Sequence, residues 1–100
     1  MKKGYGTMRN IRRRYHFKGR VKGVGFRYKA TYAARTLGLT GWVRNEYDGS
    51  VSMEVQGKAE YIDSLISKLF ADRVIDIQDL SVTEIALVPS LLEKTFREKY

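Results

Sequence analysis

The sequence predicts a single domain of the α+β class, built as a split βαβ sandwich. Its 100 residues are enough for one modest core. Segments in which apolar and polar residues alternate are separated by two segments with helical spacing. The resulting order is strand, helix, strand, strand, helix, strand (βαββαβ), with a short strand at the C-terminus. Two crossover helices between strands are typical of this architecture.

The first strand, loop and helix are predicted from the start of this pattern. Residues 15–21 alternate between apolar or small and polar side chains, which indicates a half-buried strand. A loop is expected at residues 22–25. Apolar side chains then recur with helical spacing over residues 26–37, and Gly38 suits the left-handed residue that ends a helix.

A hairpin is predicted after this helix. Residues 39–45 alternate as a second strand, and residues 51–56 alternate as a third strand that Gly57 ends. Between them, Asp48 and Gly49 are expected to supply the positive φ angles of the turn.

A second helix and two strands complete the prediction. Five apolar residues from Ile62 to Phe70 share one helical face. Residues 80–88 form a fourth strand, Pro89 breaks the pattern, and residues 94–100 suit a short edge strand. We expect both helices on one face of an antiparallel sheet, which is the ferredoxin-like arrangement. Many activities share this fold, so it assigns no function by itself.

The start of the chain is expected to lie outside this fold. Residues 1–13 combine dense positive charge with little periodicity. We predict that they form a flexible basic extension and that residues 14–100 form the domain.

Composition excludes several classes of site. The chain has no cysteine, so it has no disulfides, thiolate nucleophiles or cysteine metal sites. Its one histidine, His16, cannot form a histidine-rich metal site and is expected on the strand surface. We therefore expect no metal and no cofactor. No apolar run approaches the ~18 residues of a membrane helix and no apolar segment follows the basic start, so we expect no membrane span and no secretory signal. The absence of cysteine fits a cytoplasmic location, and we expect a monomer.

Charge is divided unevenly along the chain. Residues 1–45 hold thirteen Lys or Arg and no acid, whereas residues 46–100 hold six Lys or Arg and eleven Asp or Glu, so the two parts carry +13 and −5. This asymmetry favours an anionic ligand near the first part. Nucleic acid is expected to bind, if at all, only through the basic start of the chain.

The stretch RVKGVGFRYK, residues 20–29, is the strongest candidate for a site, and three interpretations compete. It resembles an RNA-contacting consensus, but that consensus belongs on a third strand and this stretch follows the first. It could also be a plain turn. In the third interpretation, glycines at 23 and 25 let successive amides form an anion-binding nest at the positive end of a helix. Arg27 is unfavourable as a cation in the first helical turn, but it suits an anion site.

Two sequence blocks resemble the acylphosphatase family. The stretch GRVKGVGFR is similar to the family signature G-x-V-Q-G-V-x-F-R, and GWVRNEYDGSVSMEVQG is similar to its second block. The resemblance runs from about Tyr15 to Tyr100 and implies hydrolysis of the carboxyl–phosphate bond of acyl phosphates. It also implies catalytic roles for Arg27 and Asn45. The implied phosphate-binding loop comprises Lys22, Gly23, Val24, Gly25, Phe26 and Arg27. Lys22 departs from the usual Gln, but a contribution through its backbone amide would survive that change.

The residues fit this chemistry without a metal. Acyl phosphates release a carboxylate, whose low pKa removes the need for a general acid. Arg27 and the loop amides can stabilise the phosphoryl oxygens, and the Asn45 amide can orient an attacking water. We expect direct attack of water on phosphorus, with acyl phosphate and inorganic phosphate as the only small-molecule partners. The alternatives are a turn-forming role for Asn45 and, for the whole chain, a noncatalytic ferredoxin-like module that binds RNA or another anion.

Overall fold

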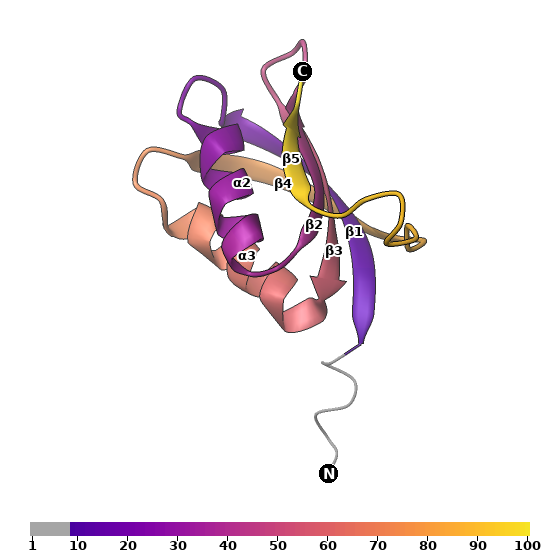
Figure 1. Cartoon of the computed structure of the whole chain (residues 1–100). Coiled ribbons are helices and arrows are strands. Elements are labelled where there is room, and N and C mark those ends of the chain that lie inside the picture. Colours follow the sequence, from indigo (N-terminus) through magenta and orange to yellow (C-terminus); the bar gives the residue numbers. More distant parts are fainter. Residues whose placement is uncertain (1–8) are drawn as a thin grey trace.

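A five-stranded sheet carries both helices on one face (Figure 1). The computed structural model describes residues 9–100. Its strands lie in the spatial order β4-β1-β3-β2-β5. The elements are β1 (Asn10–Arg20), α2 (Phe26–Thr36), β2 (Thr40–Asn45), β3 (Val51–Lys58), α3 (Ala59–Ala71), β4 (Asp76–Ile85) and β5 (Phe96–Lys99). The predicted ferredoxin-like α+β sandwich is confirmed.

The last strand corrects one part of the prediction. The pairs β1–β3, β1–β4 and β2–β3 are antiparallel as expected, but β5 runs parallel to β2. After β4 at one edge, the chain crosses to the opposite edge and enters β5 in the direction of β2. The register pairs Gly41 with Phe96 and Arg44 with Lys99, so the C-terminus lies beside the end of β2.

The core lies between the sheet and the helices. Tyr15 and Phe17 of β1 point into it as the alternation predicts, and the Phe17 ring lies 4.9 Å from that of Phe26 in α2. Ile62 and Leu69 of α3 are buried, but Phe70 is half-exposed because it lies at the margin of that apolar face. Gly38 has a φ of 72° directly after α2, as predicted.

The N-terminal boundary differs from the prediction. Strand β1 begins at Asn10, so residues 10–13 belong to the domain, whereas residues 1–8 of the predicted extension lie outside the described residues. The Arg12 side chain is only 2% exposed. It donates to Glu54 Oε1 at 3.0 Å and to both carboxylate oxygens of Glu93 at 2.7 and 3.1 Å. Three consecutive arginines hid the alternation of β1 in the sequence, because an arginine is normally taken as an exposed position. Arg12 is buried, however, because its charge is ion-paired.

The β2–β3 turn also differs at one residue. Gly49 has a φ of 88°, but no residue other than glycine has a positive φ in residues 9–100, so the expectation for Asp48 was wrong. The Asp48 carboxylate instead accepts hydrogen bonds from the Ser50 amide at 3.0 Å and the Ser50 hydroxyl at 2.6 Å. A side chain that caps the turn removes the need for a second left-handed residue.

Substitution of Arg12 tests the first of these corrections. Burial alone would lower the pKa of Arg12, but its hydrogen bonds with Glu93 and Glu54 raise it. Arg12→Met leaves Glu93 without its partner and Glu54 with only Arg14. It should lower the free energy of unfolding in urea by about 2 kcal/mol, less than for fully buried pairs because the carboxylates are partly exposed. The control Arg14→Met, at an exposed arginine, should cost less than about 1 kcal/mol. Equal stability of the two variants would show that the buried ion pairs of Arg12 do not stabilise the domain.

Candidate active site

Two left-handed glycines shape the loop between β1 and α2. Gly23 and Gly25 both have a φ of 75°, a region that other residues rarely adopt. Gly25 is the N-cap of α2, and its carbonyl accepts the amide of Lys29 at 2.9 Å. The glycines therefore allow the chain to turn sharply from the sheet into the helix.

The amides of this loop are free to bind a ligand. Among the hydrogen bonds of residues 9–100, none takes its donor from the backbone amides of residues 22–27. The first amides of a helix lack partners within it and carry the positive end of its dipole. No acidic residue occupies the first turn of α2 to satisfy them. The loop and the start of the helix therefore form a candidate anion-binding site.

A small pocket of about 210 Å³ lies at this loop and brings the predicted residues together. Arg27 and Asn45 both line it, although they are 18 positions apart in the sequence. The full lining is Val21, Gly23, Gly25, Phe26, Arg27, Tyr28, Asn45 and Glu98. Of the predicted loop, Lys22 and Val24 do not line this pocket. Lys22 lies in a neighbouring pocket with Lys18 and Arg20, and Val24 packs against the core.

The C-terminal residues hold the side chain of Arg27. Its Nη1 donates to the carbonyl of Lys99 at 3.3 Å, and its Nε lies 3.9 Å from Glu98 Oε1. The guanidinium carbon lies 4.4 Å from the centroid of the Tyr100 ring. These contacts offset the unfavourable position of a cation in the first helical turn and fix the guanidinium beside the loop.

Asn45 contributes its side-chain amide to the same pocket. It is the last residue of β2, where it pairs in register with Val51. Its side chain takes part in no hydrogen bond with another residue of the described chain, whereas the adjacent Arg44 pairs with Glu46. Both the carbonyl oxygen and the NH₂ group of Asn45 are therefore available to a ligand or a water.

Three lining residues escaped the sequence analysis. Val21 was assigned only to the strand, and Tyr28 only to the region of the helix. Glu98 reaches the pocket through the parallel pairing of β5 with β2, which no local pattern reveals. For Tyr28, its position directly after Arg27 was the available signal.

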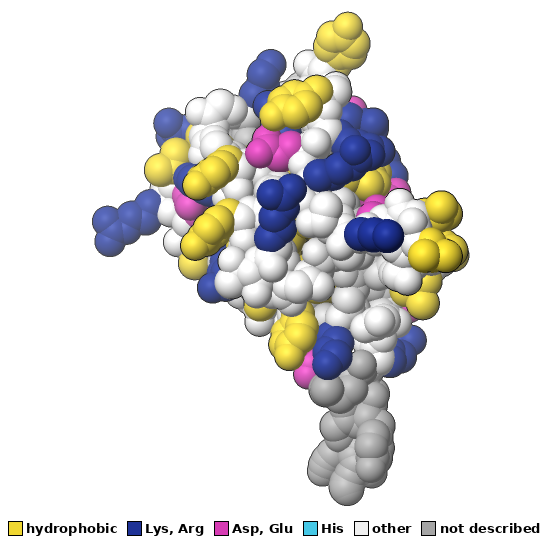
Figure 2. Space-filling view, viewed as in Figure 1, with side chains coloured by type: hydrophobic (Ala, Val, Ile, Leu, Met, Phe, Trp, Pro, Cys, Tyr) yellow, Lys and Arg dark blue, Asp and Glu magenta, His cyan; other side chains and the backbone are white. Residues whose placement is uncertain are grey.

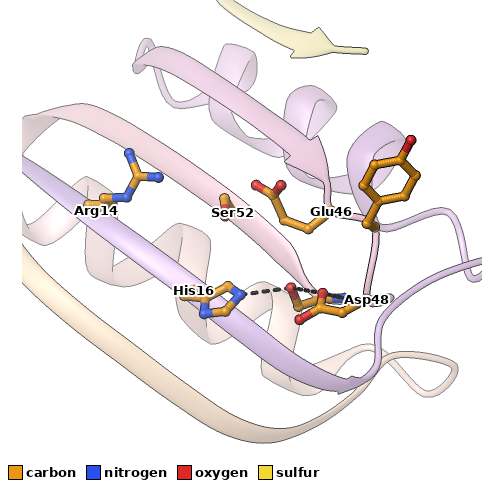
Figure 3. A pocket seen from close by; sticks show the side chains of 7 residues that line it. Arg14, His16, Glu46, Asp48 and Ser52 are labelled. Carbon is orange, nitrogen blue, oxygen red and sulfur yellow. Dashed lines mark hydrogen bonds between the residues drawn. The ribbon is translucent and has the colours of Figure 1, made fainter.

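A larger pocket of about 550 Å³ lies on the face of the sheet opposite the helices (Figure 3). His16 lines it and its Nε2 lies 2.7 Å from Ser50 Oγ, which also bonds Asp48. Hydrogen bonds from the Ser50 hydroxyl and then from its amide lower the pKa of Asp48, so this carboxylate is ionised at neutral pH and cannot act as a general acid. Neither Arg27 nor Asn45 lines this pocket. The smaller pocket is therefore the better candidate site.

Two further features of the described residues bear on the kind of protein. Within residues 9–100, no group of three or more His, Asp or Glu side chains is arranged to hold a metal ion. In the same residues, no helix has both the length and the apolar character needed to cross a membrane.

Comparison with known proteins gives a consistent result. A sequence model of the acylphosphatase family matches residues 13–97. The acylphosphatase of Oceanobacillus iheyensis is 41% identical over 81 residues, which cover 79% of this chain and 87% of that protein. The acylphosphatase of Salinibacter ruber is 56% identical over 48 residues, which cover 48% of this chain and 50% of that protein. The crystal structure of acylphosphatase from Bacillus subtilis superposes with a TM-score of 0.81 at 31% identity, covering 90% of this chain and 99% of that one.

Glu98 generates a testable prediction because it places a negative charge next to the free amides. Glu98→Gln keeps the size of the side chain but removes the carboxylate that lies 3.9 Å from Arg27 Nε. We expect inorganic phosphate to bind roughly 3- to 10-fold more tightly, which corresponds to about 1 kcal/mol for a partly exposed charge pair. Isothermal titration calorimetry measures the change. Glu60→Gln in α3 is the matched control and should leave phosphate affinity unchanged. Weaker binding to Glu98→Gln would mean that Glu98 is needed to orient Arg27.

Proposed function

Because the chain belongs to the acylphosphatase family, we propose that its loop 22–27, Arg27 and Asn45 form the active site of an acylphosphatase. The enzyme hydrolyses the carboxyl–phosphate bond of acyl phosphates to a carboxylate and inorganic phosphate. The observation that carries the site assignment is the shared pocket: Arg27, Asn45 and the glycine loop line one small cavity. The noncatalytic alternative has no observation in its favour.

The loop amides and Arg27 supply the charge stabilisation in this proposal. Phosphoryl transfer spreads negative charge over three equatorial oxygens and needs donors that are fixed in advance. Donors of this kind are the free amides at the N-terminus of α2 and the guanidinium of Arg27, which β5 holds in place. Arginine also donates two parallel hydrogen bonds to a phosphoryl group.

Asn45 orients the attacking water. Its carbonyl oxygen can accept a hydrogen bond from the water, while its NH₂ group can donate to a phosphoryl oxygen or to the same water. A carboxylate in this place would repel the anionic substrate. The water then attacks phosphorus in line with the departing oxygen, and no phosphoenzyme forms.

No residue is needed to protonate the leaving group. The departing carboxylate is the conjugate base of an acid with a pKa of about 4, so it leaves without a proton at neutral pH. This agrees with a pocket that holds Glu98 as its only carboxylate among the lining residues. The chemistry of the substrate and the residues present in the pocket therefore match.

The cellular location, the oligomeric state and any contact with nucleic acid are also proposals. The absence of cysteine supports a cytoplasmic location. We propose that the protein acts as a monomer, because Arg27, Asn45 and the loop amides of one chain are sufficient for the proposed chemistry. We also propose that any contact with nucleic acid is made through the basic start of the chain, where Lys2, Lys3 and Arg9 lie.

Asn45→Ala tests the proposed mechanism. An interaction made mainly in the transition state affects kcat, whereas uniform binding affects KM. We therefore expect kcat to fall by roughly 100-fold or more with benzoyl phosphate as substrate. The phosphate inhibition constant should stay within about threefold of wild type, because the amides and Arg27 are untouched.

The turn-forming interpretation of Asn45 predicts the opposite pattern. In that case Asn45→Ala would lose a few tenths to about 1 kcal/mol of stability and keep its turnover. Asn45→Asp sharpens the comparison because it keeps the size of the side chain and adds a negative charge. It should be as inactive as Asn45→Ala and bind phosphate more weakly. A variant Asn45→Ala that keeps more than about a third of wild-type kcat would rule out the water-orienting role.

A further inference from the structure

A groove along α2 adjoins the small pocket that Arg27 and Asn45 line, which we call the phosphate pocket. It has a volume of about 480 Å³, and Tyr28 and Glu98 line both it and the phosphate pocket. The lining residues are Tyr28, Thr31, Tyr32, Arg35, Thr36 and Glu98. All but Glu98 belong to α2, and Glu98 belongs to β5. The two cavities therefore adjoin at Tyr28 and Glu98.

Exposed tyrosines give this groove a flat aromatic side. Tyr28 and Tyr32 are 68% and 67% exposed, and their rings stack with centroids 6.5 Å apart and an interplanar angle of 19°. Figure 2 shows exposed side chains of the hydrophobic class over α2, with Lys or Arg and acidic side chains beside them. Rings exposed to this degree contribute little to the core, but they offer a stacking surface to a planar ligand.

Thr31 adds an unsatisfied polar group at the floor of the groove. It is 7% exposed, and its hydroxyl has no hydrogen-bond partner. Thr36 on the same helix donates its hydroxyl to the carbonyl of Tyr32 at 2.9 Å, which is the usual solution for a threonine in a helix. Thr31 therefore closes the floor of the groove with a buried side chain, beneath the exposed tyrosines.

The position of the groove matches the expected path of the leaving group. In-line attack places the water and the departing carboxylate on opposite sides of phosphorus. Asn45, the residue proposed to hold the water, lines the phosphate pocket but not the groove. We propose that this acyl groove binds the acyl group of the substrate and selects planar aromatic acyl groups. The inference rests on the function proposed for the phosphate pocket and extends it to substrate class.

The charges around the groove further restrict which acyl groups it can bind. Glu98 lies where the two cavities meet, so an acyl group with its own negative charge would be repelled there. Arg35 also lines the groove and stays cationic, but it does not line the phosphate pocket, so Glu98 is the charge where the two cavities meet. An uncharged aromatic acyl group avoids this repulsion and fits best.

The test compares benzoyl phosphate with acetyl phosphate in wild type and in Tyr32→Ala. Tyr32 lines the groove but not the phosphate pocket, and it is too exposed to matter for folding. We expect kcat/KM for benzoyl phosphate to fall roughly 10-fold, mostly through KM, because stacking is similar in the ground and transition states. Acetyl phosphate turnover should stay within about twofold, since an acetyl group is too short to stack on Tyr32.

Two further variants are the controls. Tyr32→Phe keeps the ring and should retain the benzoyl preference, and Tyr47→Ala, at a fully exposed tyrosine on the β2–β3 turn, should change neither substrate. Equal effects of Tyr32→Ala on both substrates, or no effect on either, would overturn the acyl groove and leave the phosphate site intact. Failure of the wild-type protein to hydrolyse either substrate would overturn the proposed function together with the groove.

Discussion

Strand β5 joins the sheet by running parallel to β2, and this pairing places the C-terminal residues beside Arg27 of the candidate site. Three C-terminal residues hold the guanidinium of Arg27. It forms an ion pair with Glu98, donates to the carbonyl of Lys99 and lies against the ring of Tyr100. The same pairing supplies Glu98 to both the phosphate pocket and the acyl groove. Without it, Arg27 would be a mobile cation in the first turn of a helix, where the dipole disfavours it.

The candidate site is built largely from backbone groups, because the proposed reaction needs few catalytic side chains. A good leaving group removes the need for a general acid, so the remaining tasks are to hold an anion and orient a water. Gly23 and Gly25 leave the loop amides free at the start of α2, and Asn45 ends the adjacent part of the sheet with an unused amide. In the proposed mechanism, these donors are already in place on α2 and β2 before the reaction begins.

Local sequence patterns predicted the parts of this arrangement that local structure determines. The alternation in β1 identified Tyr15 and Phe17 as core residues, and the glycine spacing identified the turn before Arg27. The role of Glu98 could not be predicted, because it depends on a parallel pairing between segments more than 50 residues apart. Arg12 was misassigned to a flexible extension for a similar reason: its burial depends on Glu54 and Glu93, which are distant in sequence.

The central claim is that free amides of the loop, together with Arg27, bind the phosphoryl group. Titration of ¹⁵N-labelled protein with inorganic phosphate, followed by ¹H–¹⁵N correlation spectra, tests it most directly. The largest shifts should fall on the amides of residues 22–27 and on the Arg27 side chain, and saturation should coincide with inhibition of acyl phosphate hydrolysis. Shifts confined to the neighbouring basic pocket of Lys18 and Arg20, with the loop amides unmoved, would contradict the account.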